Sequence, residues 1–339
     1  MGCAMTEKSQ IYQTMEAKWQ RGEPVIMDGG IGSELQAMGY PPADAEQSLN
    51  FTWGAMALYD NPAIVKAMHR RYVDAGAEIL LTNTFLFHRC VQLEADGDLA
   101  VPAGTWKEKA RLAVRLPREA AAEGGRPGIA IVFVMMIQDG PKEEWGRNGP
   151  SVEKGSKDWE GRVSLDYLRE LGGVFGEDRP DALMVELAPP IPADLSFPHF
   201  QALVESGIPT WISYRRRVGR PVEIFGNDLP EDGDLFGRAA RKLEEIGVSA
   251  LLVHCLPPEK AHGVASWLRE YTSLPLGVYP NNGRYDMWKW EWRHTISPEQ
   301  MAEHARGYAA EGFNIIGGCC GVRPEHITAI VETLKPVPA

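Results

Sequence analysis

The sequence predicts an α/β fold, and more specifically a single (β/α)8 TIM barrel. Eight apolar, β-branched segments recur along the 339 residues, and each is followed by turn residues and then by an amphipathic stretch. Near-continuous apolar strands that alternate with helices are typical of a parallel sheet covered on both faces. Eight such units in a chain of this length favour a closed barrel over a doubly wound sheet, which is the alternative.

The predicted strands are PVIMDGG from Pro24, EILLTNTF from Glu78, IAIVFVMM from Ile129, ALMVELA from Ala182, PTWISY from Pro209, ALLVHC from Ala250, PLGVYPN from Pro275 and NIIGGCC from Asn314. The first of them leads into DGGIGSEL, which has Gly30 and Gly32 but Leu35 where a dinucleotide-binding loop would place its third glycine. The missing glycine argues against a dehydrogenase built on a doubly wound sheet.

Two of the predicted helices carry clear start signals. NPAIVKAMHRRYVDAGA begins with Asn61 and Pro62, and SPEQMAEHARGYAAEG begins with Ser297 and Pro298. Asn and Ser are favoured N-caps, and proline fits the first helical position because its missing N–H has no partner there. Both stretches end at a glycine, as a helix followed by a tight turn requires.

The domain organisation follows from this pattern. Residues 1–22 form an N-terminal extension with a helix, and residues 23–336 form the barrel. A polar, glycine-rich segment at 138–162 is inserted after the third strand. A loop of this length in a compact domain is typically a lid or a disordered segment.

Composition excludes several classes of function. A formal net charge of -11 without a strong basic patch argues against a nucleic-acid partner and against an anionic membrane surface. No run of about eighteen apolar residues and no secretory signal is present. The N-terminal MGCAMT matches an N-myristoylation pattern on Gly2, and so short a pattern arises easily by chance. Five cysteines are too few for a disulfide scaffold and indicate a reducing, cytoplasmic setting with thiol or metal chemistry.

Polar side chains and cysteines gather at the predicted strand ends. In a (β/α)8 barrel these ends converge on one mouth, where active sites of the fold are found. The residues concerned are Asp28, Thr82 to Thr84, Glu186, Cys255, Asn281, Asn282, Cys319 and Cys320. Three of the five cysteines therefore meet at that mouth.

Three thiolates at one mouth suit zinc and leave its fourth position for a substrate or water. Neighbouring Cys319 and Cys320 can both face one ion if the backbone bends sharply, and the glycines around them permit such a bend. The alternative is that the three cysteines are small buried apolar residues, which is common for one cysteine and less so for three that converge.

The segments MDGGIGSEL, AGAEILLTNTF, LVHC, VYPNNG and GGCCGVRPEHI, in this order and spacing, resemble the homocysteine S-methyltransferase family, from Pro24 to about Leu334. The family includes betaine-, S-methylmethionine- and cobalamin-dependent enzymes. The resemblance implies a zinc-dependent barrel in which Cys255, Cys319 and Cys320 bind the metal. It also implies that Asp28, Gly29 and Glu186 hold the amino-acid end of homocysteine, where they are joined in our prediction by Thr84 and Asn282.

By the same resemblance, zinc activates the homocysteine thiol for direct attack on the methyl group of a cationic donor, giving methionine. Trp53 matches an aromatic residue of the betaine site, but that site has tyrosines where this chain has His88 and Leu187, and Met135 and Met136 place bulk at the mouth. We therefore favour a sulfonium donor over betaine. His88 is a candidate fourth zinc ligand for the substrate-free enzyme.

Alternatives to this function are a different thiol acceptor and a non-enzymatic, zinc-stabilised barrel. Asp28 and Glu186 argue against the second, because a structural site needs no clamp for an amino acid. One barrel occupies nearly the whole chain and leaves no room for the folate or corrin domains of cobalamin-dependent relatives. Trp288, Trp290 and Trp292 form a stripe that either packs against another element, including a second subunit of a homo-oligomer, or forms a cation-π wall for the donor.

Overall fold

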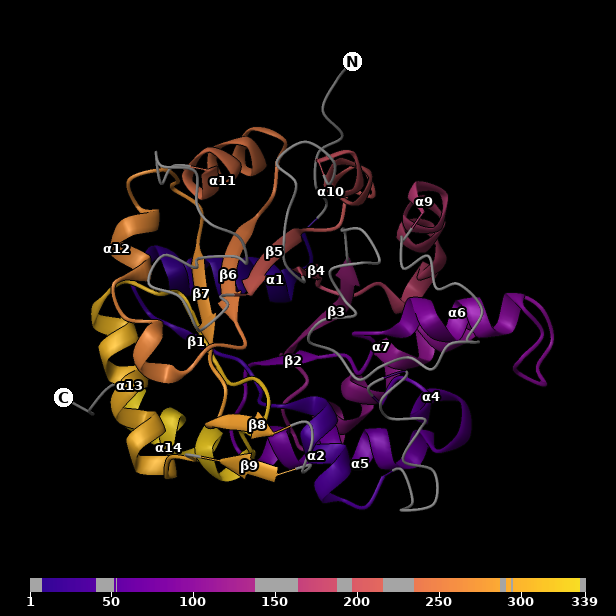
Figure 1. Cartoon of the computed structure of the whole chain (residues 1–339), viewed down its shortest axis with the longest axis horizontal. Coiled ribbons are helices and arrows are strands. Elements are labelled where there is room, and N and C mark those ends of the chain that lie inside the picture. The colour runs from indigo at the N-terminus through magenta and orange to yellow at the C-terminus, as the bar shows by residue number, and fades with distance from the viewer. Residues whose placement is uncertain are drawn as a thin grey trace.

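A computed structural model describes residues 8–40, 52, 54–137, 164–187, 197–215, 235–286, 291–293 and 295–335. Eight parallel strands form a nearly closed barrel in the order β1-β10-β7-β6-β5-β4-β3-β2 (Figure 1). A parallel bridge between Met27, which follows β1, and Ile79 of β2 joins the two ends of this order. These strands are β1 (Val25–Ile26), β2 (Ile79–Leu81), β3 (Ala130–Ile137), β4 (Ala182–Leu187), β5 (Thr210–Arg215), β6 (Ala250–His254), β7 (Leu276–Tyr279) and β10 (Ile315–Ile316). Each coincides with a predicted strand, and β3 and β5 run slightly past the predicted ends, so the prediction of a (β/α)8 barrel is confirmed.

Helices surround the strands and connect them (Figure 1). They are α1 (Gln10–Gln20), α2 (Ile31–Ala37), α4 (Ala57–Asp60), α5 (Pro62–Asp74), α6 (Phe87–Ala95), α7 (Thr105–Glu123), α9 (Leu165–Val174), α10 (Phe197–Val204), α11 (Leu235–Glu245), α12 (Val264–Leu268), α13 (Pro298–Ala310) and α14 (Pro324–Leu334), with short 3-10 turns η2 (Gly176–Asp178) and η3 (Pro258–Lys260). The predicted caps are confirmed, because Asn61 caps α5 and Ser297 caps α13 through a capping box. No described helix is long and apolar enough to cross a membrane.

Strand alternation divides the buried side chains into two layers. Ile131 and Phe133 of β3 belong to the core between the sheet and the helices, whereas Val132 and Val134 belong to the core inside the barrel. Successive side chains of a strand point to opposite faces, so each strand supplies both layers. The barrel interior is therefore a packed core, and only the strand ends remain to line a site.

Helix α1 contributes to the interior core. Its Tyr12, Met15 and Trp19 are buried in the same apolar cluster as the first residues of several strands, and the indole of Trp211 in β5 donates a 3.1 Å hydrogen bond to the Tyr12 hydroxyl. The helix thus covers the N-terminal end of the barrel and leaves the C-terminal end for chemistry. The division into an extension at 1–22 and a barrel at 23–336 stays a prediction.

The sequence pattern did not reveal a second, antiparallel pair of strands. β8 (Arg284–Asp286) pairs with β9 (Glu291–Arg293) in a hairpin that follows β7. Trp292 lies in β9, while Trp288 and Trp290 lie outside the described residues. The segment 138–162, predicted as an insertion after the third strand, also lies outside them.

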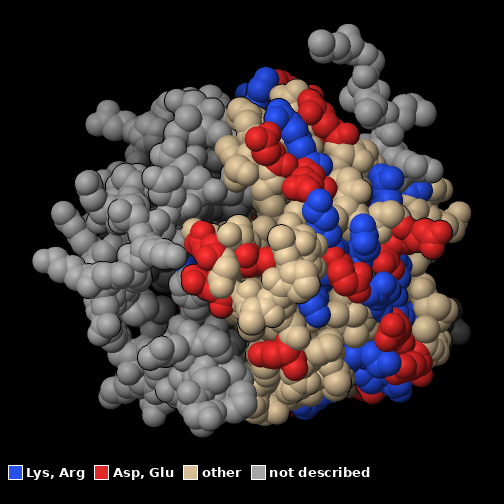
Figure 2. All heavy atoms as spheres, turned by 90° about the vertical axis from the view of Figure 1, so that its right-hand side faces the viewer, with Lys and Arg blue, Asp and Glu red and all other residues tan. Residues whose placement is uncertain are grey.

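Charged side chains of both signs are mixed on the face that Figure 2 shows. Lys66 pairs with Glu119 and Glu123, and Lys107 pairs with Glu170. Side chains in all of these pairs are about one-third exposed or more, so each pair adds little to stability. No large area of one sign is visible on the described part of this face.

Candidate active site

The structure brings Cys255, Cys319 and Cys320 together at the C-terminal end of the barrel. Cys255 directly follows β6, and the other two lie in the loop after β10. The sulfur of Cys255 is 2.9 Å from that of Cys319 and 3.9 Å from that of Cys320, and the latter two sulfurs are 3.9 Å apart. None of the three cysteines forms a disulfide, and all three are partly exposed, so ligands from outside can reach them.

The backbone at these cysteines is bent as the prediction requires. Cys255 has a φ of 53°, the one positive φ of a non-glycine residue in the described part of the chain. Such a conformation costs on the order of 1–3 kcal/mol and is typical of functional sites. In the other loop, a Cβ on Gly318 would lie 2.1 Å from a methyl carbon of Val322, so the turn at the paired cysteines needs glycine.

The electrostatics of the cluster favour a cation. Cys319 lowers the pKa of Cys255 by hydrogen bonding, but Cys320 and burial outweigh this and raise it to about 11. Hydrogen bonding with Cys255 and Cys320 raises the pKa of Cys319 well above its usual value, and burial adds a smaller rise. Cys255 and Cys319 therefore stay protonated near neutral pH unless a positive charge joins them.

The three thiols fit zinc. Tetrahedral coordination with Zn–S bonds of about 2.3 Å places two sulfurs about 3.8 Å apart. The two distances that involve Cys320 are both 3.9 Å, and the 2.9 Å contact between Cys255 and Cys319 needs to open by about 1 Å. Among the described residues, these three cysteines form the one group of three or more His, Cys, Asp or Glu side chains whose ligand atoms all lie within 4.8 Å of one another. The described residues thus offer three clustered ligands to an ion that takes four.

Asp28 follows β1 and is fully buried. Its Oδ2 accepts a 2.8 Å hydrogen bond from the backbone N–H of Leu81, whereas its buried Oδ1 has no partner among the described residues. Burial, opposed in part by this hydrogen bond, raises the pKa of Asp28, and the charge of Glu186 adds to the rise. A buried carboxylate with an unused oxygen beside a second carboxylate is suited to a cationic ligand.

Glu186, near the end of β4, is held by a chain of hydrogen-bonded side chains that the sequence pattern did not reveal. The Tyr279 hydroxyl lies 2.9 Å from Glu186 Oε1 and 2.6 Å from Ser213 Oγ, which is 2.8 Å from His254 Nδ1. His254 Nε2 lies 3.9 Å from Glu186 Oε2. All four side chains are buried and come from the ends of β4, β5, β6 and β7. Polar residues at neighbouring strand ends were the signal that could have found them.

Gly29, Thr84 and Asn282, predicted to bind substrate, are each engaged within the fold. A Cβ on Gly29 would lie 2.3 Å from the carbonyl oxygen of Val322, so a close approach of two loops requires this glycine. The Thr84 hydroxyl donates to the Val134 carbonyl at 2.6 Å and ties the segment after β2 to β3. The Asn282 N–H donates to the Cys320 carbonyl at 2.9 Å, which supports the cysteine loop directly. Their contacts with a substrate stay predictions.

The remaining predicted residues are less well placed or lie outside the described part. His88 lies in α6, where burial lowers its pKa to about 3, and it does not belong to the set of clustered ligand atoms, so its role as a fourth ligand stays a prediction. Trp53 lies outside the described residues. Met136 packs with Phe85 and Leu86 beside Glu186, its register partner, whereas Met135 points into the outer core and adds no bulk to the mouth.

Known proteins resemble this chain along nearly its whole length. Homocysteine S-methyltransferase 3 of Zea mays is 28% identical over 340 residues, which covers 93% of this chain and 91% of that protein. Selenocysteine Se-methyltransferase of Brassica oleracea var. italica is 26% identical over 357 residues, covering 97% and 94%. The metallated form of the homocysteine methyltransferase MmuM from Escherichia coli matches with a TM-score of 0.63 at 23% identity, covering 93% of this chain and 98% of that one.

The structural match supports the barrel fold, and the sequence matches extend to the residues at its mouth. The family model described as homocysteine S-methyltransferase matches residues 25–334. This range includes the three clustered cysteines, Cys255, Cys319 and Cys320, and the two carboxylates, Asp28 and Glu186. The protein is accordingly a methyltransferase, and the chain belongs to the homocysteine S-methyltransferase family.

Proposed function

We propose that this protein transfers a methyl group from a sulfonium donor to the thiol of homocysteine, giving methionine, with zinc held by Cys255, Cys319 and Cys320. The observation that carries the proposal is the meeting of three cysteine sulfurs with two buried carboxylates at one end of the barrel. The thiols suit a soft metal, and the carboxylates suit the ammonium group of an amino acid. A purely structural zinc site would instead close with a fourth protein ligand.

Asp28 and Glu186 would bind the acceptor by its amino group. The unpartnered Oδ1 of Asp28 and the carboxylate of Glu186 can each accept a charge-assisted hydrogen bond. An ammonium group between them would offset both the burial and the mutual repulsion of the two charges. The hydrogen-bonded chain of Tyr279, Ser213 and His254 holds Glu186 in one orientation, so the acceptor would be bound in one direction with its thiol toward the cysteines.

A zinc ion at this site would supply the Lewis acidity that lowers the pKa of a thiol bound to it. The thiol proton leaves to solvent, and the sulfur attacks the methyl carbon of the donor. A carbon–sulfur bond forms to homocysteine while the bond between the methyl group and the donor sulfonium breaks, and the electron pair stays with the donor as a neutral thioether. Thiols this close stay reduced in a reducing compartment, so the proposal includes a cytoplasmic location.

A sulfonium is proposed as donor because it has a better leaving group than a quaternary amine and needs less help from an aromatic cage. S-Methylmethionine and dimethylsulfoniopropionate are candidates of this class, and betaine is the quaternary amine to compare. Trp53 is the proposed aromatic contact to the methyl groups of the donor, at about 0.5 to 2 kcal/mol.

A second acceptor is favoured by one observation. Selenocysteine methyltransferases are among the relatives, at 26% and 23% identity. A selenol is more acidic than a thiol and is also a soft ligand, so the same three cysteines and the same carboxylates could serve it. Selenocysteine is therefore the acceptor to compare with homocysteine.

The test is a matrix of acceptors and donors with the zinc-loaded protein. Homocysteine, selenocysteine and cysteine, each labelled with carbon-13 in the carbon chain, are combined with S-methylmethionine, dimethylsulfoniopropionate and betaine, and the labelled methylated product is measured by mass spectrometry. The label is placed on the acceptor because S-methylmethionine itself becomes methionine when it loses a methyl group. The proposal expects the highest kcat/KM for homocysteine with a sulfonium. A higher kcat/KM for betaine, or for selenocysteine, would replace the donor or the acceptor named here.

A further inference from the structure

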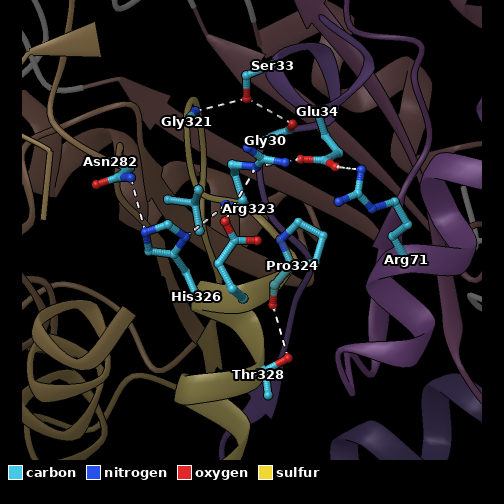
Figure 3. Close-up of polar contacts among 12 residues, drawn as sticks. Gly30, Ser33, Glu34, Arg71, Asn282, Gly321, Arg323, Pro324, His326 and Thr328 are labelled. Carbon is cyan, nitrogen blue, oxygen red and sulfur yellow. Dashed lines mark hydrogen bonds and ion pairs between the residues drawn. The ribbon is translucent and has the colours of Figure 1, made fainter. Parts of the chain in front are cut away.

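Glu34, in α2, is a fully buried carboxylate outside the catalytic residues described above. Its Oε1 lies 2.5 Å from Arg71 Nη1 of α5, and its Oε2 lies 3.2 Å from Arg323 Nε. Figure 3 shows the carboxylate between the two guanidinium groups. Glu34 therefore joins three parts of the chain that are far apart in sequence, and one of them is the end of the cysteine loop.

Arg323 stands three residues after Cys320 and is the N-cap of α14. Its backbone N–H donates to His326 Nδ1 at 3.2 Å, and His326 Nε2 lies 3.1 Å from the side-chain amide nitrogen of Asn282 (Figure 3). Asn282 also donates its backbone N–H to the Cys320 carbonyl. The end of the cysteine loop is thus held from the Glu34 side and from the Asn282 side.

Residues next to Glu34 hold the same loop. Ser33 Oγ accepts a 2.9 Å hydrogen bond from the Gly321 N–H and donates to the Gly30 carbonyl at 3.0 Å (Figure 3). The Gly30 N–H donates to the Val322 carbonyl at 2.8 Å. A Cβ on Gly30 would lie 2.6 Å from the Cys319 carbonyl oxygen, so α2 and the loop are in direct contact. Any shift of α2 must therefore move the loop.

The contacts of Glu34 with Arg71 and Arg323 depend on the negative charge of its carboxylate. Burial raises the pKa of Glu34, and Arg323 and then Arg71 oppose the rise. The side chains of Arg71 and Arg323 are 41% and 40% exposed, so water can solvate them if the carboxylate is neutralised. Glu325 is an alternative partner, 3.6 Å from Arg323 and 52% exposed, but it lies in α14 itself and ties the loop to nothing else.

We propose that Glu34 is a positioning residue, and that the Arg71–Glu34–Arg323 ion cluster sets where Cys319 and Cys320 stand relative to Cys255. The inference rests on the proposed function in one respect, because it takes these cysteines to be the zinc ligands. Without the cluster, the loop keeps its backbone hydrogen bonds, including the 2.7 Å bond from the Cys319 N–H to the Pro280 carbonyl and the 2.9 Å bond from the Asn282 N–H to the Cys320 carbonyl, but loses its side-chain anchor at Arg323. Cys320, nearer the released end, is the ligand expected to move most.

The experiment compares Glu34→Gln, Arg323→Gln and Arg323→Lys with the matched control Glu325→Gln. Zinc affinity is measured by competition with a chromophoric chelator, and the cobalt-substituted proteins are compared by their sulfur-to-metal absorption. We expect Glu34→Gln and Arg323→Gln to weaken zinc binding about 10- to 100-fold, the range typical of residues that orient metal ligands. Arg323→Lys, which keeps the charge, should recover part of this loss, and Glu325→Gln should bind zinc within about twofold of wild type.

A merely structural role predicts a different pattern. If Glu34→Gln and Arg323→Gln lowered the melting temperature but kept wild-type zinc affinity and cobalt absorption, the proposal would be overturned. If Glu34→Gln failed to fold, Arg323→Gln would still decide the question. Arg323 is partly exposed, and after its loss the buried Glu34 still has Arg71 as its counter-charge.

Failure of the proposed zinc function is recognised separately. If the wild-type protein bound no zinc at the cysteines, a trivalent arsenical that bridges neighbouring thiols would report their spacing without any metal. Weaker arsenical binding by Glu34→Gln than by wild type and by Glu325→Gln would then support the positioning role, and equal binding by all three would overturn it.

Discussion

Replacing Glu186 by Gln tests the acceptor site with little change in shape. The Gln side chain keeps the length of Glu and one carbonyl oxygen, so the contact with the Tyr279 hydroxyl, 2.9 Å in the wild type, can persist. What is lost is the negative charge beside Asp28. The substitution therefore isolates the electrostatic contribution of Glu186 from its packing.

The magnitude follows from the contact that is lost. A charge-assisted hydrogen bond contributes about 1.5–3 kcal/mol, and about 1.4 kcal/mol corresponds to a factor of ten. We therefore expect homocysteine to bind about 10- to 150-fold more weakly. The stability of the ligand-free protein should change in the opposite direction, because the charge of Glu186 is one of the causes that raise the pKa of Asp28, and its removal relieves that repulsion.

Calorimetric titration of homocysteine into zinc-loaded protein under reducing conditions measures the affinity, and thermal unfolding measures the stability. Glu94→Gln is the matched control, because Glu94 is as buried as Glu186 and accepts a hydrogen bond from the Trp106 N–H, but lies in α6 and takes no part in the site described above. Zinc content should be unchanged in both variants. Equal homocysteine affinity in wild type and Glu186→Gln would remove Glu186 from the acceptor site.

Three further predictions concern the metal, a loop contact and pH. Cys319→Ser should lower zinc content well below one ion per chain by elemental analysis, and an unchanged content would remove Cys319 from the metal site. Gly29→Ala should lower stability by about 1–3 kcal/mol in denaturant unfolding, because its Cβ would lie 2.3 Å from the Val322 carbonyl oxygen; wild-type stability would contradict this packing. His69, fully buried with neither ring nitrogen hydrogen-bonded among the described residues, has its pKa lowered by burial to about 3. Between about pH 6.5 and 3, His69 is therefore protonated in the unfolded state but not in the folded state. The free energy of unfolding falls as pH falls through that range, by up to about 1.4 kcal/mol per pH unit. His69→Leu should show a shallower loss in denaturant unfolding measured over this range, and an identical slope would refute the assignment.

The amino-acid order determined the barrel and the meeting of its cysteines. Each inner strand of a closed parallel barrel is buried on both faces, so it reads as an apolar run that can be recognised without knowing its neighbours. Caps such as Asn61 and Ser297 act within one turn of helix and are also visible locally. Once eight strands are placed, the fold itself requires that Cys255, Cys319 and Cys320 lie at one end.

The tertiary structure alone decided which side chains orient these groups. Tyr279, Ser213 and His254 surround Glu186 because the register of four strands aligns their ends. Glu186 and Tyr279, which share a hydrogen bond, are separated by 93 residues in the chain. Register is a relation between such distant segments, so no single segment encodes it.

Glu34 illustrates the same limit. In sequence it is one acidic residue on a short helix, where a solvated side chain is the ordinary expectation. In the structure it is fully buried between Arg71 and Arg323, the second of which lies 289 residues further along the chain. Local patterns determine strands, caps and the residues that carry chemistry, because these depend on neighbours in sequence. The side chains that hold the chemistry in place depend on packing between distant segments, and only the folded chain brings those together.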